Sequence, residues 1–213
     1  DPDIVDPEPN HDGYHSIGEY KWSNNTSEEY LSYGKSDVKT ILEDWYKKNI
    51  ISRGLDNKIA DPGFCNDMSK EKYESNMVSG TFYRSKKRIP TLICPDKSNN
   101  LLRRENNKLV YPVGLITVDE LLFGGIVGDG TVAFNYIYDI SDHGNPFWTI
   151  SPFLNYSPNG QQLIEIAYIT ERAALGRTKI NSDYLALIPV INLKPDTIIA
   201  KGDGTISNPY IVS

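Results

Sequence analysis

Short apolar segments separated by turn residues fill most of the chain after residue 130, and this pattern limits the choice of fold. The segments are rich in β-branched and aromatic residues, which favour strands, and clusters of Gly, Asn, Asp and Pro divide them. They are Thr131–Ile140, Phe147–Phe153, Gln162–Thr170, Tyr184–Leu193 and Tyr210–Val212. Because helical patterns precede these segments and do not alternate with them, the sequence predicts an α+β domain with an antiparallel sheet and a few helices.

Two earlier segments carry the signals of helices. In the first, Ser36 is the expected N-cap, and Lys47 and Lys48 lie where the helix dipole favours cations. The apolar face of this helix has the spacing i, i+3, i+4 and i+7 and consists of Val38, Ile41, Leu42 and Trp45. In the second segment, Thr117 and Glu120 form a capping-box pattern ahead of a stop at residues 124–125. Both helices are expected to pack against the core.

The charge balance excludes several classes of protein. Asp and Glu outnumber Lys and Arg by 28 to 22, giving a net charge of −6, whereas a general nucleic-acid binder needs a basic face. The compact basic cluster Arg84–Arg88 is interpreted as a solvated loop. No apolar run approaches the roughly 20 residues of a transmembrane helix. We therefore expect no nucleic-acid partner, and membrane attachment only through an anchor upstream of this chain.

The first 17 residues differ from the rest in composition. Five acidic residues and three prolines precede Tyr14, and such a stretch stays extended and solvated. We interpret residues 1–17 as a spacer from which an upstream signal or anchor has been removed, and residues 18–213 as one α+β domain.

Two cysteines, Cys65 and Cys94, lie in the irregular part of the sequence between residues 50 and 109. A disulfide between them would hold this turn-rich segment in place and would stabilise the fold by about 3 to 4 kcal/mol. Two buried thiols or half of a metal site are the alternatives that the residues leave open.

No motif indicates catalysis or a cofactor. His143 and Ser151 are close enough in sequence to suggest a hydrolytic pair, but Ser151 precedes Pro152 and has no nucleophile elbow around it. Residues 128–133 match a dinucleotide-binding pattern, yet a strand-like segment follows instead of the required helix. We predict no catalytic residue and no cofactor.

The tetrapeptide GDGT occurs twice, at Gly128–Thr131 and Gly202–Thr205. Its Asp makes it a candidate calcium loop, and Asp203 is a weak ligand-contact candidate, but one Asp per loop is a poor donor set. The favoured interpretation is a turn. The second copy is expected to return the strand Tyr210–Val212 to the sheet, so that deleting residues 206–213 would unfold the domain.

Several ordered motifs between Trp22 and the C-terminus resemble a family of secreted or surface-anchored domains of unknown function from Gram-positive-type bacteria. They are DVKTILEDWYKKNI, DPGFCNDMS, TLICPDK, YPVGLITVDELLFGG, FWTISP and IPVINLKPDTIIAKGDGTISNPYIV. The resemblance implies a C-type-lectin-like fold behind a signal, anchor or pilin-like leader. It also implies that Cys65 and Cys94 pair, and that Trp148, Pro152 and Pro189–Leu193 build the scaffold. Ile188 stands where the family often has Arg, so a function of that Arg cannot be transferred to this chain.

These observations predict a non-enzymatic, extracellular module on the surface of a Gram-positive-type bacterium, used for adhesion, recognition or assembly. Its partner would be an unknown surface glycan or protein. Trp148 and Tyr156 are weak candidates for an exposed contact platform, with core burial the favoured alternative for Trp148. The soluble head of a type IV pilin-like (minor pilin) subunit and a cell-wall or polysaccharide hydrolase are the alternative functions.

Overall fold

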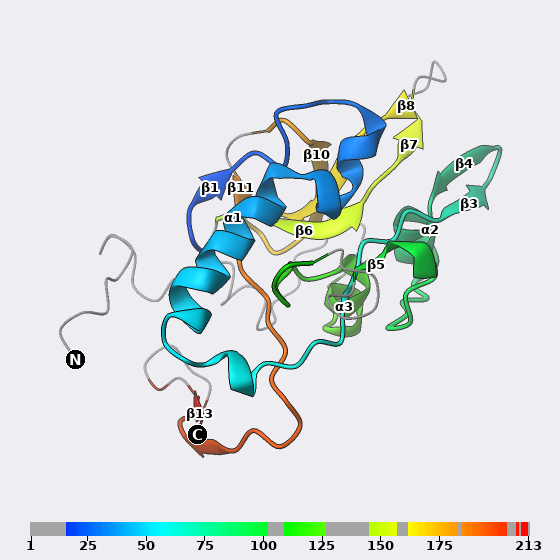
Figure 1. Cartoon of the computed structure of the whole chain (residues 1–213). Coiled ribbons are helices and arrows are strands. Elements are labelled where there is room, and N and C mark those ends of the chain that lie inside the picture. The colour runs from blue at the N-terminus through cyan, green and yellow to red at the C-terminus, as the bar shows by residue number, and fades with distance from the viewer. Residues whose placement is uncertain are drawn as a thin grey trace.

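The computed structural model describes residues 16–101, 109–126, 145–156, 162–182, 185–203, 208 and 210–212. Its centre is a five-stranded sheet in the order β1-β11-β6-β9-β10 (Figure 1). The strands are β1 (Glu19–Tyr20), β11 (Leu185–Ala186), β6 (Phe147–Pro152), β9 (Glu165–Ile169) and β10 (Leu175–Lys179). β11 and β6 are parallel, and the other neighbours are antiparallel. The predicted α+β class with a mostly antiparallel sheet is confirmed.

Strand β6 is buried along its whole length, because apolar clusters cover both faces of the sheet at this position. Trp148 and Ile150 pack in the larger cluster, which contains Leu42 of the first helix. Phe147 points the other way and packs with Leu121. This alternation is what a strand with both faces covered requires.

Trp148 is therefore a core residue and not part of an exposed platform. Its side chain is 0% exposed, and its indole Nε1 donates a hydrogen bond of 2.7 Å to the Tyr20 carbonyl. The Trp22 ring lies 6.0 Å from it, centroid to centroid. The prediction of Trp148 as a ligand contact is wrong, and the favoured alternative, burial, is confirmed.

Helix α1 (Asp37–Tyr46) forms as predicted. The Ser36 hydroxyl accepts a hydrogen bond of 3.1 Å from the Lys39 amide, which caps the helix. Val38 and Leu42 are buried, and Trp45 packs partly buried against the core. The helix continues into the π-turn η3 (Lys47–Ile51).

Helix α3 (Val118–Phe123) also has the predicted ends. The Thr117 hydroxyl accepts from the Glu120 amide at 3.1 Å, and the Glu120 carboxylate accepts from the Thr117 amide at 2.7 Å. This capping box is confirmed, with Gly124 at the C-cap.

The basic cluster at residues 84–88 is not a solvated loop, which corrects the sequence-based interpretation. It forms the second half of helix α2 (Gly80–Lys87), whose N-cap Ser79 accepts a hydrogen bond from the Phe82 amide. Arg84 is buried on the inner face of this helix, while Lys86 and Lys87 are exposed. Four of the five residues are cations, and the sequence alone does not indicate which of them has buried partners. All four were therefore interpreted as solvated.

Short elements surround the central sheet. The helical turns are η1 (Glu28–Leu31), η2 (Tyr33–Lys35), η4 (Asp56–Lys58) and η5 (Lys97–Asn99). The antiparallel ribbons are β2 (Phe64–Cys65) with β5 (Asn100–Leu101), β3 (Lys70–Tyr73) with β4 (Asn76–Ser79), β7 (Asn155–Tyr156) with β8 (Gln162–Leu163), and β12 (Ile199–Lys201) with β13 (Ile211–Val212). In the described part of the chain, no helix has the length and apolarity that crossing a bilayer requires.

Most of the N-terminal spacer lies outside the described residues. Its last residue, Ile17, already belongs to the fold, since its amide donates to the Leu187 carbonyl at 2.9 Å and its side chain packs against the core.

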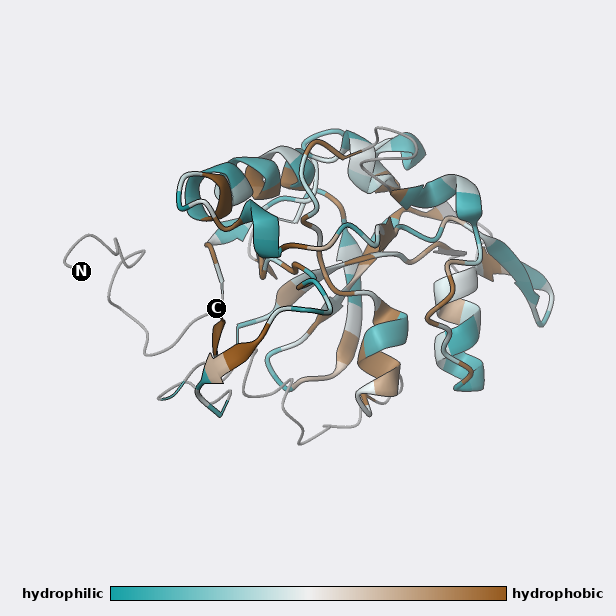
Figure 2. Cartoon of the chain, turned by 60° about the horizontal axis from the view of Figure 1, so that its bottom comes forward, coloured by the Kyte–Doolittle hydropathy of each residue, from teal (hydrophilic) through white to brown (hydrophobic). Residues whose placement is uncertain are grey.

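The C-terminal hairpin corrects a second prediction. β13 pairs with β12, as expected for a strand returning after a turn, but the two form a ribbon of their own and do not extend the central sheet. Figure 2 shows this ribbon as an apolar projection beside the C-terminus. Ile198, Ile199 and Ile211 are 66%, 55% and 56% exposed, so the ribbon adds little to the core.

Truncation should therefore be tolerated, contrary to the sequence-based prediction. We expect removal of residues 199–213 to shift the midpoint of thermal unfolding by less than about 4 °C, because the described residues of this segment are exposed or half-buried. A chain that ends before residue 185 is the matched control, and it should not fold because it loses β11 of the central sheet. If the chain that lacks residues 199–213 no longer unfolds cooperatively, the ribbon is part of the core.

Candidate binding pocket

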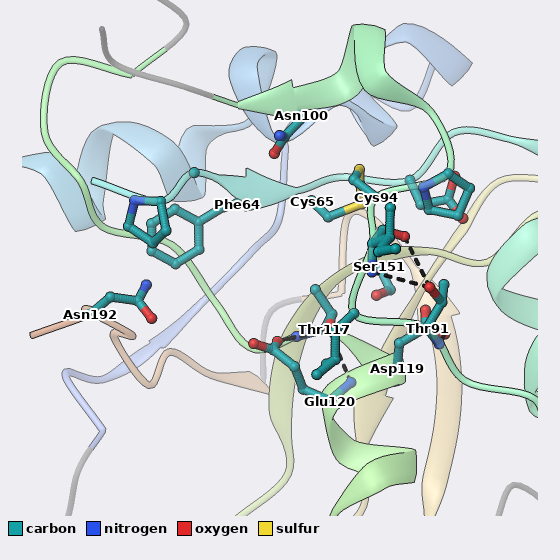
Figure 3. Close-up of a pocket in the computed structure, with 16 residues that line it drawn as sticks. Phe64, Cys65, Thr91, Cys94, Asn100, Thr117, Asp119, Glu120, Ser151 and Asn192 are labelled. Atoms are coloured by element: carbon teal, nitrogen blue, oxygen red, sulfur yellow. Dashed lines mark hydrogen bonds between the residues drawn. A yellow bond between two sulfur atoms is a disulfide. The ribbon is translucent and has the colours of Figure 1, made fainter. Parts of the chain in front are cut away.

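A pocket of about 240 Å³ opens beside the disulfide, between the N-terminal end of α3, strand β2 and the loop at residues 91–95 (Figure 3). Its lining combines apolar groups, amides, hydroxyls and carboxylates. The lining residues are Pro62, Gly63, Phe64, Cys65, Asp67, Thr91, Leu92, Ile93, Cys94, Pro95, Asn100, Thr117, Asp119, Glu120, Ser151 and Asn192.

The predicted pairing of Cys65 with Cys94 is confirmed, and the bridge forms one wall of this pocket. It joins β2 to a loop that lies 29 residues further along the chain. The loop is also held from the other side, since the Thr91 amide donates a hydrogen bond of 2.9 Å to Asp119 Oδ1. The two attachments fix the shape of the pocket wall without a regular element in the loop itself.

A buried ion pair lies behind the pocket. Arg84 donates to both oxygens of Asp119, from Nε to Oδ1 and from a terminal nitrogen to Oδ2, at 2.7 Å each. It also donates to Asp67 Oδ2 at 2.7 Å. Burial by itself would lower the pKa of Arg84, but hydrogen bonds and charge from Asp119, and then from Asp67, raise it overall. Arg84 therefore stays protonated, and both carboxylates are committed to it.

The other acid and the serine of the pocket have structural partners too. Glu120 Oε2 accepts from the amide and the hydroxyl of Thr117, each at 2.7 Å. The Ser151 hydroxyl is buried and accepts a hydrogen bond of 3.0 Å from the Val118 amide. The Glu120 contacts cap helix α3, and the Ser151 contact joins this helix to strand β6.

The opposite wall contains an aromatic ring and two amides. Phe64 packs over Gly114, where an added Cβ would lie 2.5 Å from the ring, so this wall depends on a glycine. Asn100 and Asn192 flank the ring in Figure 3. Among the residues drawn there, the Asn192 side-chain amide has no hydrogen bond. The amide is therefore a candidate contact for a ligand.

Only some of the other residues singled out from the sequence can be placed relative to this pocket. Tyr156 lies in β7, and its side chain is outside the described residues, as are His143 and the first GDGT segment. Asp203 is exposed, and its amide donates to the Asn208 carbonyl at 3.1 Å. Within the described ranges, no group of three or more His, Cys, Asp or Glu residues could hold a metal ion.

Comparison with protein families, curated proteins and solved structures finds no match for this chain. The likeness to C-type lectins and to the surface-domain family thus stays a prediction, whereas the α+β class rests on the strands and helices themselves.

Proposed function

We propose that this chain is a non-enzymatic recognition module of a bacterial surface, and that the pocket beside Cys65–Cys94 binds a neutral, hydroxyl-rich ligand such as a surface glycan. The observation that carries the proposal is the lining of this pocket. Two amides, Asn100 and Asn192, flank an aromatic ring, while Asp67 and Asp119 are paired with Arg84 and Glu120 is bonded to Thr117. Neutral polar ligands are bound in this way, by a few polar groups on an apolar wall.

The commitment of the carboxylates favours binding over hydrolysis. A glycoside hydrolase needs one carboxyl group to donate a proton and another to act as base or nucleophile. Asp67 and Asp119 share the protonated Arg84, and Glu120 is used in the helix cap. The Ser151 hydroxyl is likewise engaged by the Val118 amide. These four groups hold the fold together at this position.

The disulfide supports the proposed extracellular location, since such bonds persist in oxidising compartments. We keep the C-type-lectin-like likeness and the Gram-positive-type surface as parts of the proposal.

A glycan array tests this function. The wild-type chain should give saturable binding to one class of glycan, and the signal should be the same with calcium and with a chelator, because the pocket wall has no metal-binding cluster among its described residues. An Asn192→Trp variant should lose the signal, since the large side chain fills the pocket. Asn192→Ala should weaken binding about 3- to 10-fold, as expected for one lost hydrogen bond.

An Asn181→Trp variant is the matched control, because Asn181 is exposed and lies outside the pocket. It should bind like the wild type. Equal binding by the Asn192→Trp variant would contradict the proposed site, and silence of the wild type on every glycan would contradict the proposed ligand class.

A further inference from the structure

Three large aliphatic side chains are exposed within five residues of each other, between helix α2 and the disulfide. Ile89, Leu92 and Ile93 are 52%, 72% and 76% exposed. Single exposed apolar residues are common on soluble proteins, but a cluster of this kind usually marks a contact surface. We call residues 89–93 the aliphatic loop.

The fold fixes this loop at both ends, so that its side chains project into solvent from a defined position. Helix α2 ends at Arg88 in the left-handed conformation, with φ 57° and ψ 44°, and Pro90 prevents the helix from continuing. Thr91 is bonded to Asp119, and Cys94 is bonded to Cys65. The exposure of Leu92 and Ile93 is therefore a property of an anchored loop.

Cations stand directly before the aliphatic loop. Lys86, Lys87 and Arg88 are exposed, although the whole chain carries a net charge of −6. Lys86 Nζ lies 5.7 Å from the centroid of the Phe82 ring, and Lys87 Nζ lies 5.6 Å from that of Tyr73. A helix dipole accounts for cations at this end of α2. It does not account for the exposed aliphatic side chains beside them.

The acids nearby have partners of their own. Asp67 and Asp119 are buried and share the single positive charge of Arg84, and Glu120 accepts hydrogen bonds from Thr117. Asp96 accepts hydrogen bonds from Ser98 and Asn99. Glu120 and Asp96 keep their negative charges, so the exposed positive charge beside the aliphatic loop is that of Lys86 and Lys87 at the end of α2.

We propose that the aliphatic loop and the cations Lys86 and Lys87 form a contact site for an anionic lipid bilayer. Cations are attracted to anionic headgroups, and aliphatic side chains gain free energy when they enter the boundary with the acyl chains. An anionic polymer would satisfy the cations but would leave Leu92 and Ile93 in water. The pairing of both features favours the bilayer. Leu92 and Ile93 also line the proposed glycan pocket, so the two proposals share this loop, and the bilayer contact is additional to any upstream anchor.

Vesicle co-sedimentation of the full chain tests the proposal. The protein should bind vesicles of phosphatidylcholine mixed with phosphatidylglycerol and should bind pure phosphatidylcholine vesicles at least about tenfold more weakly, with binding falling as salt rises. Leu92→Ser/Ile93→Ser should lower binding to the anionic vesicles about tenfold or more, by loss of aliphatic burial. Lys86→Gln/Lys87→Gln should lower it about tenfold, because each cation adds to the attraction.

Two double variants elsewhere are the controls. Ile198→Ser/Ile199→Ser changes aliphatic side chains that are similarly exposed on the C-terminal ribbon, and Lys47→Gln/Lys48→Gln removes two exposed cations at the end of α1. Both should bind like the wild type. All of the changed residues are exposed, and a thermal unfolding scan verifies that each variant is folded.

Three results would overturn the proposal. They are failure of the wild type to bind anionic vesicles, equal losses in the control variants, and inhibition by soluble polyphosphate combined with unchanged vesicle binding of the Leu92→Ser/Ile93→Ser variant. The last result would assign the cations to an anionic polymer. The glycan array is read with the Asn192 variants, which leave the aliphatic loop and its cations unchanged, so failure of one proposal can be told from failure of the other.

Discussion

Replacing Arg84 with methionine is expected to lower the free energy of unfolding by about 3 to 5 kcal/mol, the range measured when one partner of a buried ion pair is removed. Methionine fills much of the same space but leaves Asp67 and Asp119 buried without a cation. Both carboxylates are bonded to Arg84 at 2.7 Å and are less than a tenth exposed. Urea unfolding followed by tryptophan fluorescence measures the change, since Trp22 and Trp148 are in the core.

An exposed pair provides the control. Lys70 lies 3.1 Å from Glu28, and both side chains are more than 40% exposed. Lys70→Met should therefore change the free energy of unfolding by at most about 1 kcal/mol. Adding Asp67→Asn and Asp119→Asn to the Arg84→Met variant should recover part of the loss, because the unpaired charges are gone. A loss below about 1 kcal/mol in Arg84→Met would contradict a stabilising role for this ion pair.

Removing the disulfide should have an effect of similar size. For a loop closed over 29 residues, the chain-entropy relation gives about 3 to 4 kcal/mol of stabilisation. The Cys65→Ala/Cys94→Ala variant should lose that amount in urea unfolding. It should also lose binding on the glycan array, because the bridge is a wall of the pocket.

Reduction of the wild-type chain separates the two effects of this substitution. If the bridge acts by holding the loop, reduced wild-type protein should match the double variant in both stability and binding. Unchanged stability after reduction would show that the loop at residues 91–95 is held by its other contacts, such as the hydrogen bond between Thr91 and Asp119.

Local signals predicted the elements that depend on neighbouring residues. Helix α1 followed from a 3.6-residue period and a serine cap, and helix α3 followed from a capping box, because both signals lie within a few residues of the helix that they specify. The strand β6 was visible as an apolar segment for the same reason. The cysteine pair was also predicted, since two cysteines allow few alternatives.

Long-range pairing explains what the sequence analysis missed. The cluster at residues 84–88 looked solvated because the partners of Arg84 lie 17 and 35 residues away, and nothing near Arg84 marks it as different from Lys86. The pocket likewise joins segments from Pro62 to Asn192. The walls of the pocket come together only when the chain is folded. The two cysteines are the sequence signal that could have located the pocket.

The C-terminal ribbon illustrates a different limit. Alternation of turn and apolar residues predicted the hairpin correctly, but the same apolar residues are found in core strands and on contact surfaces. Ile199 and Ile211 are exposed, so their hydrophobicity was not evidence of burial.

The pocket as ligand site is the central claim, and an amide chemical-shift titration tests it most directly. The glycan with the strongest array signal would be added to ¹⁵N-labelled protein. We expect shifts at residues 63–65, 91–94, Thr117 and Asn192, with none in the ribbon at residues 199–212. Saturable shifts centred on the ribbon, with the pocket amides unchanged, would contradict it.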